Sequence, residues 1–345
     1  MNMPSEVASP KNPPVSRKRD GVGSVTMDPA GLYMHVTPEA ELMSPVTSAE
    51  QHFVLAHHGI ARCAAETWTL SLTDATGNKK IVSLDQIKAL PAREVTAALE
   101  CAGNPEDPDK PLRIVSNAVW RGPTLRSLLA AMAAHDARYV WMTGVDWGGY
   151  AGETTDSYVK DIPIAKAMDE DVIVAYDMNG APLTPEHGFP LRLVVPGFYG
   201  TNSVKWLSAI SLHDERPKSL FTTRLYNDWR SGEAVPVWAM AVNSRLLSPA
   251  AGATLAHGPV EIFGRAWGHA AVQAVDLSTD GGLSWFEAEL EPRQSGYSWQ
   301  TFRARWAPPG PGRYEIAVRA RDIQGQVQPE TLHINQIQRV AFEVA

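Results

Sequence analysis

The stretch Ala98-Leu99-Glu100-Cys101-Ala102-Gly103-Asn104 decides how this chain is interpreted. Its apolar residues continue a β-like run that begins at Val95, and the Gly-Asn pair after Cys101 favours a turn. The thiol therefore stands at the end of a strand and faces a loop, where binding and catalytic groups are often placed. Two interpretations of Cys101 stay open at this point. It is a buried structural cysteine, as most free cysteines are, or a thiolate that does chemistry.

The cysteine count narrows that choice. The chain has 345 residues and 2 cysteines, Cys63 and Cys101. This count excludes a four-thiolate iron–sulfur cluster or zinc site within one chain, and a framework of disulfides. A Cys-x-x-Cys-His motif is absent as well, so we expect no haem in this chain. A cysteine that matters here acts alone, as a nucleophile or as the single thiolate ligand of a metal held mainly by other groups. Cys63 has no comparable context and is interpreted as structural.

Composition and charge exclude several partners. The 31 Lys and Arg residues against 38 Asp and Glu residues give a net charge of −7, which argues against a nucleic-acid or anionic membrane surface. No stretch approaches the ~20 apolar residues of a membrane span. No apolar run of signal-peptide length follows the basic run Arg17-Lys18-Arg19. We therefore expect a cytoplasmic protein that binds neither nucleic acid nor membrane.

Three segments differ in character along the chain. Residues 1–45 begin with a polar, proline-rich stretch and are predicted to form an N-terminal arm, either flexible or wrapping. Residues 46–235 mix short β-like runs with helical patterns, such as a capping box formed by Ser83 and Gln86, which predicts an α+β domain with long loops. Residues 236–345 hold short strands at roughly 8–12-residue spacing, which is typical of a β-sandwich of immunoglobulin type.

A second group of polar residues lies in two motifs, His187–Arg192 and Pro196–Trp206. The backbone amides of a glycine-rich loop, together with Arg192 and Lys205, make a cradle for an anion such as a phosphate. The spacing is neither that of a Walker loop nor that of the dinucleotide-binding fingerprint. A phosphorylated ligand is therefore one interpretation, and a turn with solvated charges is the other.

The sequence His57-His58-Gly59 is a third feature. Adjacent residues of a strand point to opposite faces, so the two imidazoles cannot easily share one metal. We expect one histidine to face a pocket and the other to face the core or the solvent.

Three of these motifs, in their order and spacing, resemble motifs of the sulfite oxidase family of molybdenum enzymes. They are Ala98–Asn104, His187–Arg192 and Pro196–Trp206. Ser278–Trp285 resembles the signature of that family's C-terminal dimerisation domain. The resemblance implies a sulfite-oxidase-type molybdopterin-binding domain over residues 46–235, followed by an immunoglobulin-like dimerisation domain over residues 236–345. It therefore also implies a homodimer.

The resemblance further implies the activity and the cofactor. The chain would be a molybdopterin-dependent oxidoreductase that carries out two-electron oxygen-atom transfer on a small-molecule substrate. Since no haem motif is present, its electrons would pass to a separate, external acceptor. Cys101 would be the one protein ligand of molybdenum, with two further sulfurs supplied by the pterin dithiolene, because a soft thiolate suits a metal already held by sulfur.

The resemblance assigns roles to other residues too. Those expected to hold the pterin or its phosphate are His58, Asp146, His187, Arg192, Ser203 and Lys205. Asp146 has an alternative role as the cap of a turn. Tyr226, counted on from Lys205 without gaps, falls where the family has an active-site tyrosine, although residues 224–227 depart from the family's usual sequence. Its hydroxyl can donate a hydrogen bond as charge develops on an oxygen.

Three positions depart from the arginines with which the family meets sulfite. They are Ala56, two residues before the pterin histidine; Glu106, with Pro105, after the Cys101 loop; and Gln300, beside Trp299. Each charge-assisted contact is worth about 1.5–3 kcal/mol, so we expect weak sulfite binding unless other residues replace the missing arginines. The candidates are Arg62, Arg121, Arg224, Arg230 and His57.

These departures keep two alternatives open. The chain is a family member that acts on another sulfur compound, or that reduces an S-oxide or an oxyanion. Alternatively, it is a relative that binds the cofactor without catalysis. The retained Cys101 and Tyr226 argue against that second alternative.

Overall fold

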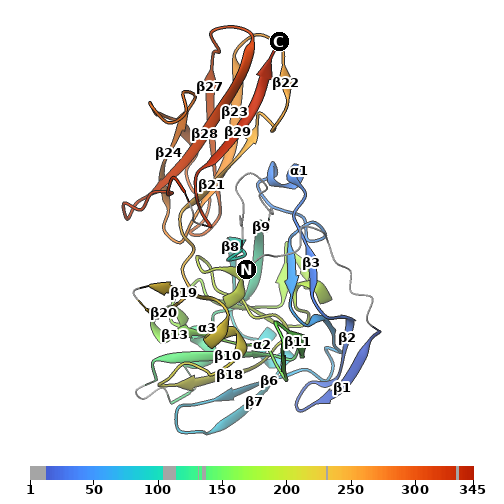
Figure 1. Ribbon diagram of the computed structural model, residues 1–345. Helices are drawn as coiled ribbons and strands as arrows, with labels where there is room; N and C mark the ends of the chain where they lie inside the picture. The colour runs from blue at the N-terminus through green and yellow to red at the C-terminus, as the bar shows by residue number, and fades with distance from the viewer. Residues whose placement is uncertain (1–12, 104–113, 131, 134–136, 231, 332–333) are drawn as a thin grey trace.

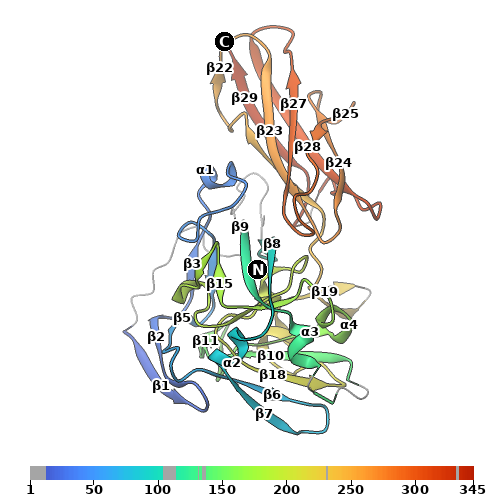
Figure 2. The same ribbon diagram turned by 180° about the vertical axis from the view of Figure 1, so that it is seen from behind.

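The computed structural model describes residues 13–103, 114–130, 132–133, 137–230, 232–331 and 334–345. The chain forms two bodies that stand end to end, a broad one below and a slender one above (Figures 1 and 2). Most of the regular structure is strand, and the α-helices that the structure describes have four or five residues each. The predicted order of an α+β domain followed by a β-sandwich is confirmed. No helix in the described ranges is long and apolar enough to cross a membrane.

The described part of the predicted N-terminal arm is folded onto the first body. Strand β1 (Val15–Arg19) pairs with β2 (Gly23–Ala30), and β2 pairs in turn with β5 (Gly59–Arg62). Strand β3 (Tyr33–His35) pairs with β4 (Val54–Ala56). Residues 13–45 therefore brace both strands that flank His57 and His58.

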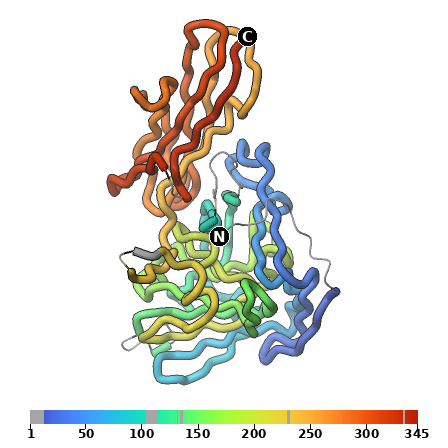
Figure 3. The backbone as a smooth tube through the Cα atoms, viewed as in Figure 1, coloured from blue at the N-terminus to red at the C-terminus, as the bar shows by residue number. Residues whose placement is uncertain are grey.

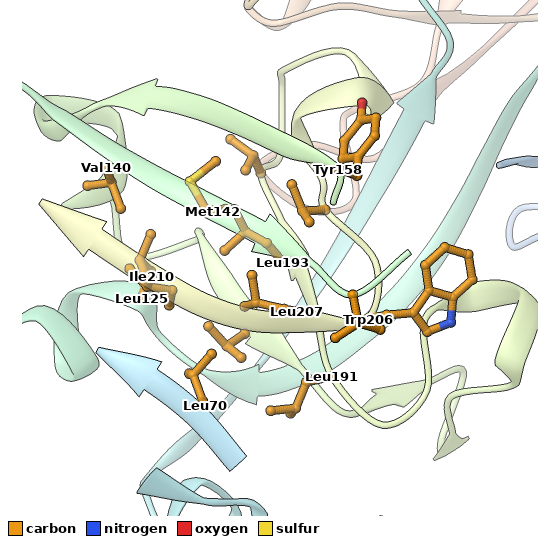
Figure 4. Close-up of a cluster of buried hydrophobic side chains, with 14 of the residues drawn as sticks. Leu70, Leu125, Val140, Met142, Tyr158, Leu191, Leu193, Trp206, Leu207 and Ile210 are labelled. Carbon is orange, nitrogen blue, oxygen red and sulfur yellow. The ribbon is translucent and has the colours of Figure 1, made fainter. Parts of the chain in front are cut away.

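A five-stranded sheet forms the base of the first body. Its order is β13-β10-β18-β6-β7, antiparallel except for the parallel pair β18 and β6. The strands are β6 (Thr69–Thr73), β7 (Lys79–Ser83), β10 (Tyr139–Gly144), β13 (Val159–Pro163) and β18 (Leu207–His213). Every second residue of β10 is buried, as expected for a strand with one covered face. Figure 4 shows side chains of this sheet gathered with Leu125, Leu191 and Leu193 in one apolar core.

One short helix begins where the sequence predicted its cap. At α2 (Leu84–Lys88), the Gln86 N–H donates to Ser83 Oγ at 3.2 Å and the Ser83 N–H donates to Gln86 Oε1 at 2.9 Å, which confirms the capping box. Helix α3 (Leu125–Leu129) buries the leucines that show helical spacing. The other short helical segments are α1 (Glu39–Leu42), α4 (Ile164–Ala167), the 3₁₀ turns η1 (Pro185–His187) and η2 (Gly200–Asn202), and the π turn η3 (Leu220–Arg224).

A long antiparallel ladder rises from the first body toward the second (Figures 1 and 2). It joins β8 (Ala92–Glu100) to β9 (Val115–Pro123), in register from the pair Ala92–Pro123 to the pair Glu100–Val115. The sheet is completed by β15 (Asp177–Met178) and β16 (Ala181–Pro182). Smaller antiparallel pairs are β11 (Gly148–Tyr150) with β12 (Glu153–Thr155), β14 (Ile173–Ala175) with β17 (Arg192–Val194), and β19 (Asn227–Arg230) with β20 (Glu233–Pro236). Because β8 ends at Glu100, Cys101 lies at the end of the ladder nearest the second body.

The second body, the upper one in Figure 3, is a sandwich of two sheets that overlap in that view. One sheet has the order β21-β23-β27-β26 and the other has the order β22-β29-β28-β24-β25. The first sheet contains β21 (Asn243–Ser248), β23 (Val260–Trp267), β26 (Glu289–Leu290) and β27 (Gln300–Trp306). The second contains β22 (Thr254–Leu255), β24 (Val272–Ser278), β25 (Phe286–Glu287), β28 (Gly312–Asp322) and β29 (Gln338–Val344). Apolar residues from both sheets form a separate core between them.

A third apolar cluster joins the two bodies. It combines residues of the first body with residues of the second, so the contact between them is packed as a core is. Its buried members are Leu42, Ala98, Val115, Tyr199, Met240, Leu247, Phe263, Trp267 and Trp299. The end of the β8–β9 ladder is therefore buried between the two bodies.

Candidate functional site

A cleft of about 680 Å³, part of which is open to solvent, lies in the first body. All of the predicted site residues except His58 line it. These are Cys101, Asp146, His187, Arg192, Ser203, Lys205 and Tyr226. The fold therefore brings together, at one cleft, residues that come from separate parts of the sequence.

Cys101 is held at a rigid strand end. Its backbone N–H donates to the carbonyl of Ile114 at 2.9 Å, which extends the β8–β9 ladder by one residue. Its side chain is buried and lines the cleft. The other cysteine, Cys63, is not among the lining residues, and burial raises the pKa of its thiol to about 12. Of the two cysteines, Cys101 is therefore the one placed to meet a ligand.

Arg192 supplies a buried positive charge to the cleft. Its guanidinium donates to the carbonyls of His187 at 3.2 Å and Ser203 at 3.3 Å, and lies 4.5 Å from the ring centroid of Trp120. Burial lowers the pKa of Arg192 to about 9, yet the group is still charged at pH 7. A cation held by neutral carbonyls in a buried place favours an anionic ligand beside it.

Lys205 adds a second basic group near Arg192. Its Nζ donates to the carbonyl of Leu55 at 3.1 Å and to the carbonyl of Glu186 at 3.4 Å. Burial and the charge of Arg192 lower the pKa of Lys205 to about 7. Gly188 lets the backbone at this position pack closely against the side chain of Lys205. Its φ is 97°, and a Cβ at residue 188 would lie only 2.9 Å from Cβ of Lys205.

His187 and Ser203 complete the same corner of the cleft. Nε2 of His187 lies 2.7 Å from the carbonyl of Ala49, so this nitrogen carries the hydrogen and Nδ1 is left with its lone pair. Burial and the charge of Arg192 lower the pKa of His187 to about 3. Ser203 Oγ accepts a hydrogen bond from the Val195 N–H at 3.1 Å. An anion bound here would raise the pKa of His187, because it would stabilise the imidazolium form.

The two adjacent histidines divide as the sequence predicted, one toward the cleft and one away from it. His57 lines the cleft, and its Nε2 lies 2.6 Å from the hydroxyl of Tyr226. His58 is buried behind Asp146, with Nδ1 at 3.1 Å from Asp146 Oδ2 and Nε2 at 3.0 Å from Thr155 Oγ1. The structure thus places His57 on the cleft, whereas the resemblance had assigned the pterin contact to His58. His58 contacts the lining residue Asp146 and orients its carboxylate.

Tyr226 lies in a strained part of the backbone. It follows the π turn η3, and its φ of 59° falls in the left-handed region, which non-glycine residues rarely occupy. Trp206, which also lines the cleft, has a φ of 49°. Such strain concentrates at functional sites, where the surrounding structure must hold it.

Two residues near the site were missed by sequence reasoning. His52 lines the cleft; its Nδ1 bonds the carbonyl of Phe53 at 2.9 Å, and its buried Nε2 has no partner among the described residues. Lys160 is fully buried, donates from Nζ to the carbonyl of Phe221 at 3.0 Å and lies 5.2 Å from the ring centroid of Tyr226. No spacing signal marks His52. Lys160 stands in a strand whose two faces are both buried, so an alternating pattern could not reveal it.

Three of the five candidate replacements for the missing arginines lie away from the cleft. Arg62 pairs with Asp28 and Glu186, Arg121 pairs with Asp177, and Arg224 pairs with Glu153. None of these three arginines lines the cleft, whereas His57 and Ala56 do. The side chain of Arg230 and residues 104–106, which include Glu106, lie outside the described residues.

Gln300 is not at the cleft. It is a buried residue of the sandwich, where its Oε1 accepts a hydrogen bond from the Val272 N–H at 3.0 Å and its Nε2 donates to the carbonyl of Glu291 at 3.3 Å. The prediction that Gln300 stands where an arginine would meet the substrate is therefore wrong for this chain. Its amide instead links three segments of the second body.

Comparison with known protein families covers both bodies. Residues 57–221 match the family described as oxidoreductase molybdopterin binding domain. Residues 234–341 match the family described as Mo-co oxidoreductase dimerisation domain. The two matches follow one another along the chain in the order of the two bodies.

Individual proteins show the same likeness over nearly the whole chain. Mitochondrial sulfite oxidase of Rattus norvegicus is 33% identical over 329 residues, which are 86% of this chain and 59% of that protein. Sulfite oxidase of Arabidopsis thaliana is 29% identical over 339 residues, which are 86% of this chain and 85% of that protein. The crystal structure of the sulfane dehydrogenase SoxCD from Paracoccus pantotrophus has a TM-score of 0.79 at 25% identity, covering 94% of this chain and 85% of that one. The chain spans about three fifths of the length of the mammalian relatives that it matches.

Proposed function

This chain belongs to the sulfite oxidase family of molybdenum-cofactor oxidoreductases, and we propose that it binds Mo–molybdopterin in the cleft and catalyses two-electron oxygen-atom transfer on a small molecule. The observation that carries the proposal is the placement of Cys101 and of the cation pair Arg192 and Lys205 on one cleft. A thiolate for the metal and cations for a phosphate are the two things that such a cofactor requires of a protein.

The residues of the cleft fit this cofactor. Arg192 and Lys205 hydrogen-bond only backbone carbonyls in the described contacts, and a bound phosphate would stabilise the charged forms of both side chains. The buried Nε2 of His52 carries a lone pair, because Nδ1 holds the hydrogen that points to the Phe53 carbonyl. An N–H group of a pterin can donate to that lone pair. The cleft thus offers an anion site and a hydrogen-bond acceptor as well as a thiol.

The cofactor, when bound, supplies the two-electron redox chemistry, and the chain supplies binding, orientation and proton control. Cys101 would ligate the metal, and Arg192, Lys205 and Ser203 would hold the phosphate corner. Asp146, oriented by His58, would accept hydrogen bonds from the pterin. Tyr226 would donate a hydrogen bond to the substrate oxygen on which charge develops.

Further parts of the proposal concern partners. We propose that the electrons leave to a separate acceptor and that two copies of the chain associate through the second body. The match of residues 234–341 to a dimerisation domain supports the association. Light scattering during gel filtration tests it, and a mass of one chain at micromolar concentration would contradict it. The expected cytoplasmic location stays a prediction, which cell fractionation would test.

A second candidate is favoured by the lining of the cleft. Ala56, the position where the family has an arginine, lines the cleft together with His57. Burial lowers the pKa of His57 to about 3, so this side chain is neutral at pH 7. The absence of charge at these two lining positions favours an uncharged substrate, such as an S-oxide or another sulfur compound, over the sulfite dianion. A substrate panel on molybdenum-loaded protein with an artificial electron donor or acceptor decides between them. A KM for sulfite in the range of arginine-bearing relatives would contradict this second candidate.

Metal and pterin analysis tests the core of the proposal. Protein purified from a host that makes the cofactor should contain about one molybdenum and one pterin per chain. Protein that folds but contains neither would contradict the proposal.

A further inference from the structure

Glu100, the residue before Cys101, is hydrogen-bonded to the second body. Glu100 is 1% exposed, and its carboxylate accepts two hydrogen bonds from the sandwich. Asn243 Nδ2 donates to Oε1 at 2.8 Å, and Trp267 Nε1 donates to Oε2 at 2.9 Å. Both donors come from strands of one sheet of the second body, β21 and β23. A buried carboxylate needs such donors, because it has left water.

The donor Asn243 is itself fixed in orientation. Its Oδ1 accepts hydrogen bonds from the Ser244 N–H at 2.9 Å and from Gln328 Nε2 at 3.0 Å. Gln328 Oε1 in turn accepts from the Ala320 N–H at 2.7 Å. Each amide oxygen is thus an acceptor, so Nδ2 of Asn243 must face Glu100. The network runs from the end of β8 through β21 to β28 in the opposite sheet.

The edge of β8 that does not pair with β9 is also hydrogen-bonded to the second body. The Ala98 N–H donates to the carbonyl of Tyr297 at 2.9 Å, and Ser295 Oγ donates to the carbonyl of Thr96 at 2.7 Å. Thr96, Ala98 and Glu100 therefore all bond to the second body, so that every second residue of the strand before Cys101 is held. Strand β9 holds the other edge over the same residues.

We propose that the second body positions the Cys101 thiolate through Glu100, so that Glu100, Asn243 and Trp267 are positioning residues of the metal site. The proposal rests on the proposed function, in which Cys101 ligates molybdenum. Consecutive Cα atoms are ~3.8 Å apart, so a Glu100 side chain that leaves its two donors moves the peptide that carries the thiol. When Glu100 loses one of these donors, its buried carboxylate has fewer hydrogen bonds than it needs. The carboxylate then moves toward water and shifts the neighbouring peptide with it.

Substitutions confined to the second body test this coupling at the metal. Asn243→Ala and Trp267→Phe each remove one donor to Glu100 and leave the first body unchanged. The holoenzyme is measured by its molybdenum content, its thiolate-to-molybdenum absorption band, its paramagnetic molybdenum signal, and kcat and KM separately. We expect both spectroscopic signals to shift, and kcat to fall about 10- to 100-fold with KM nearly unchanged, as for a catalytic group misplaced by a fraction of an ångström.

The matched control is Asp276→Asn. Asp276 is also a buried carboxylate of the sandwich, but it lies on β24 and accepts its hydrogen bonds from Arg319 and Arg321. This variant should lose stability while its molybdenum spectrum stays that of the unaltered protein. A merely structural role for Glu100 predicts the same behaviour in all three variants.

The outcomes separate this inference from the proposed function. Unaltered protein without molybdenum would contradict the proposed function. Loaded variants whose spectra superimpose on the unaltered protein, or a control that shifts equally, would overturn the inference alone. If Asn243→Ala does not fold, Trp267→Phe, which retains an aromatic ring at that position, decides by the same measurements. Selective loss of molybdenum from a folded variant, with the control still loaded, supports the inference.

Discussion

The hydroxyl oxygen of Tyr226 lies 2.6 Å from Nε2 of His57 on the lining of the cleft. Burial lowers the pKa of His57 to about 3, so the imidazole is neutral at pH 7 and carries one N–H. When that hydrogen is on Nε2, the oxygen of Tyr226 accepts it, and the phenolic hydrogen can point at a substrate or at the hydroxyl of Thr201. The left-handed backbone of Tyr226 costs about 1–3 kcal/mol, so its hydroxyl is held in place by the surrounding fold.

Replacing Tyr226 with Phe should slow turnover without emptying the site. The variant keeps the ring and loses the hydroxyl donor, so kcat should fall about 100-fold while molybdenum content stays the same. Steady-state kinetics with an artificial electron acceptor and metal analysis check this. Tyr176→Phe is the control, because Tyr176 is buried in the same body but does not line the cleft. A kcat within twofold of the unaltered protein would show that the hydroxyl has no catalytic part.

Replacing Cys101 with Ser should reduce turnover to the background of the assay. A serine hydroxyl is a harder and much less acidic ligand than a thiol, and it suits a sulfur-bound metal poorly. Cys63→Ser is the matched control and should keep full activity, because Cys63 is not on the cleft. Measurable turnover in Cys101→Ser, with molybdenum still bound, would refute the assignment of the ligand.

Replacing Arg192 with Gln should weaken retention of the cofactor. The change removes a buried cation from the phosphate corner, and one charge-assisted contact is worth about 1.5–3 kcal/mol, or roughly 10- to 150-fold in affinity. Molybdenum and pterin per chain, measured before and after prolonged dialysis, report the effect. Arg121→Gln breaks a pair with Asp177 and a contact with the Tyr176 ring, both away from the cleft, so this variant should retain the cofactor as the unaltered protein does. Equal retention in both variants would contradict a phosphate site at Arg192.

The buried Lys160 should make the stability of the protein depend on pH. Burial lowers its pKa to about 7, whereas in the unfolded chain it is about 10.4. Between these values the unfolded chain binds more protons than the folded one, so the free energy of unfolding from this group rises with pH by up to about 1.4 kcal/mol per unit. Above the pKa of the unfolded chain, about 10.4, the contribution of Lys160 to the free energy of unfolding no longer changes with pH.

The variant Lys160→Met isolates that contribution. It should remove the rise with pH between about 7 and 10, as measured by denaturant unfolding at a series of pH values. The exposed Lys88→Met serves as the control and should leave the pH profile unchanged. An unaltered slope in Lys160→Met would mean that Lys160 is charged in the folded protein throughout this range.

The order of the two bodies and most of the cleft could be predicted from sequence. Glycine-rich loops and a cysteine at a strand end are local patterns, and they placed Cys101, Arg192 and Lys205 correctly on the cleft. The capping box of Ser83 and Gln86 is equally local and was confirmed. In these cases, the chemistry lies within a few residues of the signal that reveals it.

What the sequence could not supply depends on contacts between distant segments. The choice between His57 and His58 depends on how residues 13–45 brace strands β4 and β5, which no local pattern encodes. Gln300 was expected at the substrate site because it stands beside Trp299, but its side chain points into the sandwich toward Val272. Glu100 reads as one residue of a strand, and its partners are more than 140 positions away.

That separation sets the order in which the molecule can be made. Strand β8 leaves the ribosome long before Tyr297, Asn243 and Trp267, so a nascent chain exposes an open strand edge, and Glu100 has not yet met its two donors from the second body. The thiol therefore reaches its final setting only after the C-terminal domain has been synthesised and has docked. Cofactor insertion is consequently expected late in biogenesis, and truncated chains should be both empty and prone to aggregation.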